Sequence, residues 1–279
     1  MKPFVKWVGG KRQLLTQIKE HIPEYTGNYF EPFLGGGAVF LELEPENAVV
    51  SDLNTQLIST YKWVRDAPED LLETVERLDN QENTLENYTQ MREQYNQLVQ
   101  DKHRALDTSS YFIWLNKHCF NGVYRVNSKG VFNVPWNKKT EHINSLDEDN
   151  ILEISSYLKE ANVALLNRDY KSVLQNTTKE DFVYMDPPYV PNSVTASFTS
   201  YTKEKPLHDE IAQEFANLPC KALLSNNNNA IVQDLYADFN ITEVSARRSI
   251  NQGRGKEVLV DKIIWVWYTY IRSKKEQCF

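Results

Sequence analysis

The sequence has few of the residues that build disulfide frameworks or metal centres. Its three cysteines, Cys119, Cys220 and Cys278, lie far apart without metal-ligand spacing, and its five histidines are equally scattered. We therefore expect neither a disulfide-stabilised fold nor a bound metal. Long apolar runs are also missing, so we expect a protein of the cytoplasm with no membrane partner.

The sequence also lacks an overall basic charge. A net charge of -7 counts against a nucleic-acid partner if it is averaged over the molecule, because phosphates attract a basic surface. The charges are unevenly distributed, however. Residues 66–101 hold ten acidic residues and two arginines, whereas residues 102–140 hold seven Lys or Arg and one Asp. The second segment could therefore face phosphates while the first faces water.

Short apolar runs separated by helical patterns predict a doubly wound α/β sheet. With 279 residues and 41% hydrophobic content, the chain can bury one large core and a smaller one. Helical patterns cover Pro206–Leu218 and Ala230–Phe239, and we expect Ile241–Val244 and Lys262–Tyr268 to form an antiparallel edge. The runs that read as buried parallel strands are Ala48–Val50, Val163–Leu166, Phe182–Met185 and Ala222–Leu224.

The pattern changes between Gln56 and Asn144, where polar, helix-favouring sequence contains no convincing buried strand. We interpret this stretch as a helical insertion that carries its own basic loop at residues 120–139. The predicted organisation is a main domain of residues 1–55 and 145–279, interrupted by a helical domain of residues 56–144.

The tetrapeptide Asp186-Pro187-Pro188-Tyr189 follows the apolar run Phe182–Met185, at the strand end where open sheets bind ligands. An exocyclic amino nitrogen is a poor nucleophile unless a carboxylate and a carbonyl accept its two hydrogens. Asp186 supplies the carboxylate, Pro187 the carbonyl, and Tyr189 a face on which an extruded base can stack. The alternative is a turn in which Asp186 caps a helix that begins with the prolines.

A glycine-rich turn at residues 30–40 lets the backbone approach a ligand closely before a helix begins. It does not fit the pattern G-x-G-x-x-G, and a flexible loop is the alternative. Fifteen residues beyond Gly37, the run Ala48–Val50 leads to Asp52, whose carboxylate could accept hydrogen bonds from ribose hydroxyls. A helix-capping role is the alternative for Asp52.

The segment from Lys6 to Lys11 lacks the upstream glycine of a phosphate-binding loop and is followed by Arg12, so an ATPase is not indicated. Trp7 could pack on a cofactor and Lys11 could meet a ligand carboxylate. Spacing alone favours the plainer interpretation of a core tryptophan and a surface lysine.

The basic loop combines amide, apolar and guanidinium groups within Phe120–Asn127. Arg125 could read a guanine edge while Phe120 or Val123 wedges between bases. A loop with a solvated arginine is the alternative. Contact with DNA is favoured by the surrounding lysines, which are Lys117, Lys129, Lys138 and Lys139.

Together these motifs resemble the Dam-type DNA adenine methyltransferases, including members from restriction-modification systems and phages, whose usual target is GATC. The resemblance implies a Rossmann-like S-adenosylmethionine-dependent methyltransferase sheet with an inserted helical DNA-recognition domain. It also implies methylation of adenine N6 in double-stranded DNA after base flipping, without a metal and with S-adenosylhomocysteine as product. We expect a monomer in a bacterial cell or a phage-infected bacterium.

The resemblance also assigns residues. It implies an S-adenosylmethionine pocket formed by Trp7, Lys11, Glu31, Pro32, Phe33, Gly35, Gly37, Asp52, Asp169, Tyr170 and Asp186. The implied DNA contacts are Phe120, Asn121, Gly122, Val123, Arg125, Asn133, Pro135, Lys138 and Lys139. Arg125 would recognise the guanine of GATC. Val123 is smaller than the leucine often found there, which argues against a wedge role for it. After Pro135, Trp136-Asn137-Lys138-Lys139 stands where many relatives have Gly-Arg-Tyr after an aromatic residue, so we expect recognition of the outer bases or flanking phosphates to differ.

Two other functions stay open at this point. One is a methyltransferase that acts on RNA or on a protein amide, and the other is a DNA-binding protein without turnover. Asp rather than Asn before the two prolines, together with the basic loop, favours a nucleobase as the methyl acceptor. The presence of Lys11, Asp52 and Asp186 argues against a protein without turnover.

Overall fold

The structure is a computed structural model that describes residues 1–102, 105–190, 207–248 and 253–262. Its centre is a seven-stranded sheet with the strand order β3-β2-β1-β4-β5-β7-β6. The strands are β1 (Tyr29–Glu31), β2 (Asn47–Ser51), β3 (Asn162–Leu166), β4 (Phe182–Met185), β5 (Lys221–Asn227), β6 (Asn240–Arg248) and β7 (Gly253–Lys262). Strands β1 to β5 pair in parallel, and β7 is antiparallel to both β5 and β6. The predicted α/β class is confirmed.

All four predicted parallel strands are present, but a fifth, β1, was not predicted from the sequence. It has only three residues, all buried, and it lies between β2 and β4 in the middle of the sheet. A run of three residues is too short to show the alternation or length by which a strand is recognised. Its central position means that the glycine-rich turn begins directly at the end of a core strand.

The antiparallel edge is present, but its second strand lies earlier than predicted. Strand β7 ends at Lys262, and residues 263–268 of the predicted range lie outside the described residues. The sequence Val258-Leu259-Val260 is fully buried in β7, so these residues belong to the core. Strand β7 is inserted between β5 and β6.

Helices cover both faces of the sheet and enclose two separate apolar cores. Helices α1 (Leu15–Glu20), α2 (Ala38–Leu43) and α7 (Glu148–Glu160) contribute to one core. Helix α8 (Tyr170–Leu174), the helical residues 207–217 and helix α10 (Ala230–Leu235) contribute to the other. Helix α10 ends four residues before the predicted end, because Tyr236 and Phe239 turn inward and pack on Phe215.

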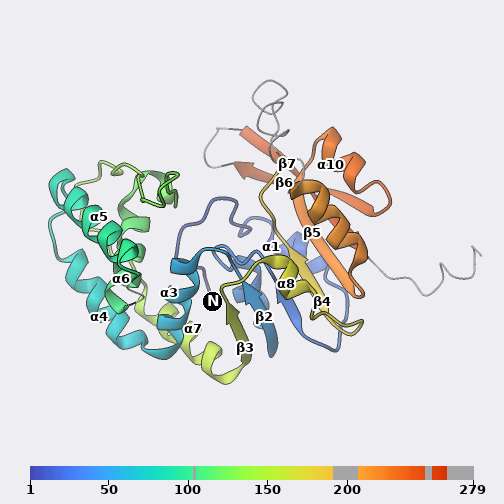
Figure 1. Cartoon of the computed structure of the whole chain (residues 1–279), viewed down its shortest axis with the longest axis horizontal. Coiled ribbons are helices and arrows are strands. Elements are labelled where there is room, and N and C mark those ends of the chain that lie inside the picture. Colours follow the sequence, from blue (N-terminus) through green and yellow to red (C-terminus); the bar gives the residue numbers. More distant parts are fainter. Residues whose placement is uncertain (103–104, 191–206, 249–252, 263–279) are drawn as a thin grey trace, which may run out of the picture.

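Where the structure describes it, outside residues 103–104, the predicted helical insertion consists of four helices and a loop. These helices are α3 (Thr55–Asp66), α4 (Pro68–Asp79), α5 (Leu85–Gln100) and α6 (Leu106–His118), followed by the short 3-10 turn η1 (Phe120–Gly122). Helix α6 is buried over most of its length because α3, α4 and α5 all pack against it. Figure 1 shows α4 to α6 on one side of the molecule and the sheet on the other, with α3 and α7 between them.

Helix α3 packs against α6 of the insertion and equally against α7 of the main part. The predicted domain border at residue 55 therefore falls at the start of a helix that packs on both the main domain and the insertion. One apolar core continues across this border. Among the described residues, no helix is both long and apolar enough to cross a membrane.

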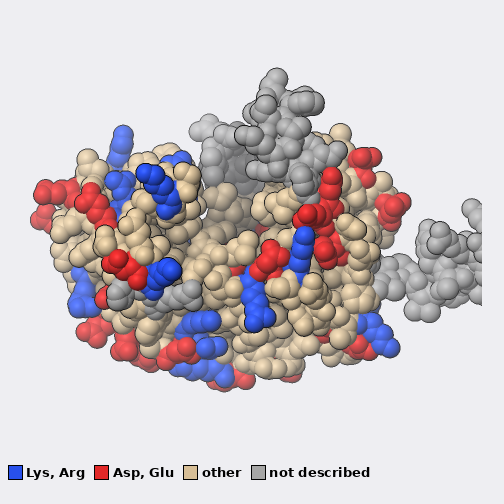
Figure 2. Space-filling model, in the orientation of Figure 1, with Lys and Arg blue, Asp and Glu red and all other residues tan. Residues whose placement is uncertain are grey.

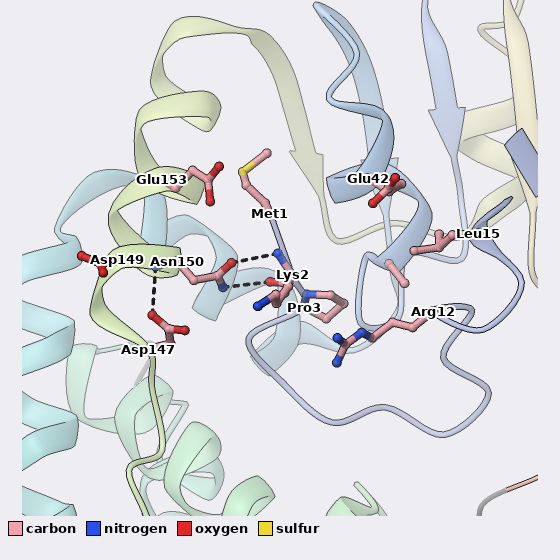
Figure 3. A pocket seen from close by; sticks show the side chains of 11 residues that line it. Met1, Lys2, Pro3, Arg12, Leu15, Glu42, Asp147, Asp149, Asn150 and Glu153 are labelled. Carbon is pink, nitrogen blue, oxygen red and sulfur yellow. Dashed lines mark hydrogen bonds between the residues drawn. The ribbon is translucent and has the colours of Figure 1, made fainter.

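Two asparagine side chains hold the N-terminal segment. The side-chain amide of Asn150 bonds to the backbone N–H and carbonyl of Lys2 at 2.8 and 2.9 Å, as Figure 3 shows. Asn116 bonds to the backbone of Lys6 in the same way, at 2.7 and 2.8 Å. A cavity of about 490 Å³ lies between the first residues, Arg12, Glu42 and the start of α7, and none of the predicted site residues lines it.

Candidate active site and basic loop

The carboxyl ends of three neighbouring parallel strands bring the predicted site residues together. Strand β1 ends at Glu31, Asp52 follows β2, and Asp186 follows β4. Parallel strands place their carboxyl ends at one edge of a sheet, which explains why residues so far apart in sequence meet there. The next parallel strand, β5, pairs with β4 and carries Ser225 at the same edge.

Asp186 is bound by two other side chains. Its Oδ2 lies 2.8 Å from Nζ of Lys11, and its Oδ1 accepts a hydrogen bond of 2.7 Å from Oγ of Ser225. Residues 186–190 are not helical, so the alternative in which Asp186 caps a helix finds no support. The carboxylate is 21% exposed, which leaves it accessible from one side.

Lys11 is a buried residue, and the alternative of a surface lysine is wrong. Its side chain is 4% exposed, and Nζ also donates to the carbonyl of Gly9 at 2.5 Å. The same ammonium lies 4.8 Å from the ring centroid of Tyr189, within the range of a cation–π contact. It therefore contacts the carboxylate and the aromatic face that the tetrapeptide was predicted to offer to a base.

Glu31 is fully buried behind this ion pair and accepts a hydrogen bond of 2.6 Å from the hydroxyl of Tyr29. Burial raises the pKa of Glu31 to about 8, and the negative charge of Asp186 adds to the rise. The Tyr29 hydroxyl and the Lys11 ammonium act in the opposite direction. The carboxyl group therefore changes its charge near neutral pH, close to the predicted reaction centre.

The glycine-rich turn is held by hydrogen bonds, which favours an ordered turn over a flexible loop. Gly35 and Gly37 have positive φ angles of 50° and 67°, which favour glycine. A β-carbon on Gly35 would lie 2.8 Å from the ring of Trp7, so only glycine fits at this position while Trp7 packs against the turn. The carbonyl of Gly36 accepts a hydrogen bond of 3.0 Å from Tyr61 of α3.

Asp52 joins the turn to the second strand. Its carboxylate accepts hydrogen bonds from the backbone N–H of Gly35 at 2.9 Å and of Asn54 at 2.8 Å. Burial raises the pKa of Asp52, and these two bonds oppose the rise. Helix α3 is capped by the Asn54 side chain, so the capping role considered for Asp52 belongs to Asn54. Each carboxylate oxygen can accept a further hydrogen bond.

Phe33 and Tyr170, which are far apart in sequence, stack with ring centroids 5.1 Å apart. Asp169, beside Tyr170, caps α8 by accepting a hydrogen bond from the backbone N–H of Lys171. Pro32 is buried next to Phe33. These residues extend the strand-end cluster toward β3.

The basic loop at residues 120–139 presents most of its predicted contact residues to solvent. Phe120 is 54% exposed although it is a large apolar residue. The guanidinium of Arg125 is held by Asn133, whose side-chain oxygen accepts a hydrogen bond of 2.9 Å from Nε. Gly122 is buried and Val123 is half-buried. The remaining predicted contact residues are all exposed: Asn121, Arg125, Asn133, Pro135, Lys138 and Lys139. Figure 2 shows Lys and Arg side chains gathered at the top of this helical part.

The N-terminal segment connects the strand-end cluster to this loop. Besides holding Lys6, the side chain of Asn116 donates to the carbonyl of Gly122 at 3.0 Å. The ring of Trp7 stacks on Tyr124, with centroids 6.0 Å apart and an angle of 12° between the planes. Sequence reasoning assigned no role to Asn116, Lys6 or Tyr124, because nothing local connects residues more than 100 positions apart.

Comparison with known proteins agrees with this geometry. Residues 7–250 match the family model described as D12 class N6 adenine-specific DNA methyltransferase. The chain belongs to this family. It is 40% identical to the type II methyltransferase M.MjaIII of Methanocaldococcus jannaschii, over 90% of this chain and 93% of the relative. It is 38% identical to M1.LlaDCHI of Lactococcus lactis subsp. cremoris (93% and 95% covered) and 32% identical to the DNA adenine methylase of Escherichia coli K12 (94% and 94%).

The prediction of a site-specific, adenine-specific DNA methyltransferase is thereby confirmed, as is the family resemblance stated from the sequence. The substrate of this methyltransferase is DNA, so the RNA, protein-amide and non-catalytic alternatives are set aside. Membership in a methyltransferase family generally implies S-adenosylmethionine as the methyl donor.

Proposed function

We propose that this methyltransferase uses S-adenosylmethionine to methylate N6 of the adenine in GATC after flipping it out of duplex DNA. The observation that carries the proposal is the cluster of Lys11, Asp186 and Tyr189. It places a carboxylate and an aromatic face around a single nitrogen cation. An adenine amino group would use the same two partners.

The strand-end cluster suits the proposed donor. The glycine-rich turn brings backbone rather than side chains to the edge of the sheet, and Asp52 has carboxylate oxygens that can accept hydrogen bonds from ribose hydroxyls. Leu53, which follows Asp52, is 69% exposed and offers apolar surface to an adenine ring. The residues proposed to hold the donor are Trp7, Lys11, Glu31, Pro32, Phe33, Gly35, Gly37, Asp52, Asp169, Tyr170 and Asp186.

When bound, the donor supplies a methyl group: the amino nitrogen forms the new N–C bond, sulfur keeps the electrons of the broken C–S bond, and one nitrogen proton passes to water. Asp186 and the Pro187 carbonyl would accept the two amino hydrogens and orient the nitrogen lone pair. Tyr189 would hold the base by stacking. Because Lys11 contacts Asp186 and Tyr189, the incoming amino group must displace its ammonium or share the carboxylate with it.

We propose that residues 56–144 form the target-recognition domain and that the remainder is catalytic, within a monomer. Exposed Phe120 is suited to fill the space left by the flipped base, and half-buried Val123 is less suited to it. Arg125, held by Asn133, is proposed to read a guanine edge. Exposed Lys6, beside Gly122, extends the basic surface toward the active site.

The test combines Asp186→Ala with mapping of modified bases in methyl-free plasmid DNA. We expect the unchanged protein to place N6-methyladenine at GATC, and Asp186→Ala to lower the rate by at least about a thousandfold. DNA binding by the variant, measured by gel shift, should change by less than about threefold. Methylation at another sequence would contradict the GATC target, and undiminished turnover by Asp186→Ala would contradict the mechanism.

A further inference from the structure

Strand β5 ends in three consecutive polar residues that are buried. Ser225, Asn226 and Asn227 are 0%, 1% and 7% exposed. Buried polar side chains are costly unless they are hydrogen-bonded, so their partners indicate why they occur in a core strand. All three have partners in the catalytic tetrapeptide or at Val190, directly after it.

Ser225 orients the carboxylate of Asp186. The register of β4 and β5 pairs Met185 with Leu224, which places the two following residues side by side. The hydroxyl of Ser225 donates its one hydrogen bond to Oδ1 of Asp186, because an ion-paired carboxylate can only accept hydrogen bonds. The hydroxyl of Tyr184, 3.2 Å from Oγ of Ser225, must then be the donor in that contact. The result is a directed chain from Tyr184 through Ser225 to Asp186.

The two asparagines hold the residue that follows the tetrapeptide. The side-chain oxygen of Asn226 accepts a hydrogen bond of 3.2 Å from the N–H of Val190, and the side-chain amide of Asn227 donates to its carbonyl at 2.7 Å. Val190 is fully buried. The tetrapeptide is thus fixed at its start by the β4–β5 ladder and at its end by Val190.

We propose that Ser225 and the pair Asn226–Asn227 are positioning residues for methyl transfer. Ser225 occupies Oδ1 of Asp186 and so turns Oδ2, which now contacts Lys11, toward the incoming amino group. Asn226 and Asn227 fix the backbone of Val190 and thereby the position of the preceding residue, Tyr189. This inference rests on the proposed function, because it assumes that Asp186 and Tyr189 contact the base. It predicts that these residues affect the chemical step and not binding.

The decisive experiment is steady-state kinetics of Ser225→Ala with the full chain. We expect kcat to fall roughly ten- to hundredfold, because small misplacements of a reacting group are costly. The KM values for DNA and methyl donor should stay within about twofold. Ser225→Thr, which keeps the hydroxyl, should recover most of the loss. An unchanged kcat, or a raised KM at unchanged kcat, would overturn the proposal.

Two further variants separate positioning from a general structural effect. Ser155 is another buried serine, in α7, which donates to the carbonyl of Arg65, and Ser155→Ala should leave kcat unchanged. Asn227→Asp removes one amide donor to Val190 with little change in size, and it should lower kcat at unchanged donor affinity. If Asn227→Asp raises KM alone, the role given to the asparagines is wrong.

A double-mutant cycle distinguishes this inference from the proposed function. If Ser225 acts through Asp186, Ser225→Ala should have no further effect in an Asp186→Asn background, measured in single-turnover assays. An equal loss in both backgrounds would overturn the inference and leave the role of Asp186 intact. Full activity of Asp186→Asn by itself would instead overturn the proposed function.

Discussion

The strand-end cluster and the basic loop at residues 120–139 hold their charges in opposite ways. At the sheet edge Lys11, Asp186 and Glu31 are largely or wholly removed from water, and the structure gives each of them hydrogen-bond partners. In the loop, Arg125 and Lys138 are exposed, and the guanidinium of Arg125 donates hydrogen bonds to the exposed Asn133. A chemical step needs fixed groups in a dry environment, whereas a surface that meets DNA needs charges that can still adapt.

The largest effect should come from breaking the buried pair. Lys11→Met leaves the Asp186 carboxylate without its cation, and we expect about 3 kcal/mol of lost stability and at least about a hundredfold loss of activity. Thermal unfolding and methylation rates measure both. The control is Lys171→Met, which breaks the exposed ion pair with Glu210 and should change neither quantity appreciably. Similar effects of the two variants would remove the distinction between buried and exposed charges.

The next effect concerns two cations of the loop. Arg125→Ala should cost roughly 1–3 kcal/mol of binding at its base pair, so that discrimination between GATC and altered sites falls about ten- to hundredfold. Lys138→Ala should weaken binding to all sequences alike and reduce the salt dependence. Binding titrations on cognate and random duplexes measure the difference. Equal losses on both duplexes for Arg125→Ala would contradict its role in reading a base.

A smaller effect should arise where the two regions meet, at the stack of Trp7 on Tyr124. Tyr124→Leu removes the aromatic contact, which is worth about 0.5–1.5 kcal/mol. We propose that the stack couples donor binding to DNA binding, because Trp7 belongs to the proposed donor pocket. The gain in DNA affinity on adding the donor, measured by gel shift, should then be roughly two- to tenfold smaller in this variant. Tyr124→Phe keeps the ring and loses only the hydroxyl contact with Tyr95, so it is the matched control. If both variants behave alike, the stack does not connect the two regions.

The last effect concerns the pH dependence of stability, which does not involve DNA. Burial raises the pKa of Glu31 from an ordinary 4.5 to about 8, so the folded state binds this proton more tightly than the unfolded state. Stability from this group is therefore fully present below pH 4.5 and is lost as the pH rises toward about 8. The melting temperature of Glu31→Gln, compared with that of the unchanged protein at the same pH, should therefore increase as the pH rises from 4.5 to about 8. A difference that does not vary with pH would contradict the buried, proton-binding state of Glu31.

Local sequence patterns were sufficient for much of the fold and for the chemical groups. The apolar runs of β2, β3, β4 and β5 predicted the sheet, and the change to polar helical sequence predicted the insertion. The tetrapeptide at residues 186–189 could be placed at a strand end because the apolar run before it is strictly local. Strand β1 was missed because three residues contain too little periodicity, and the start of β7 was missed because charged residues precede its buried centre.

The sequence by itself determined which groups this protein has for chemistry and for DNA, since residue type and local order are written along the chain. Only the tertiary structure decided how they combine: Lys11 against Asp186, Ser225 behind the same carboxylate, and Trp7 on Tyr124. These contacts join residues 39 to 175 positions apart, through the order in which strands enter the sheet and the way α6 packs beside the N-terminal segment. Neither strand order nor helix packing is encoded by neighbouring residues, because both depend on which buried surfaces fit together once the whole chain has folded.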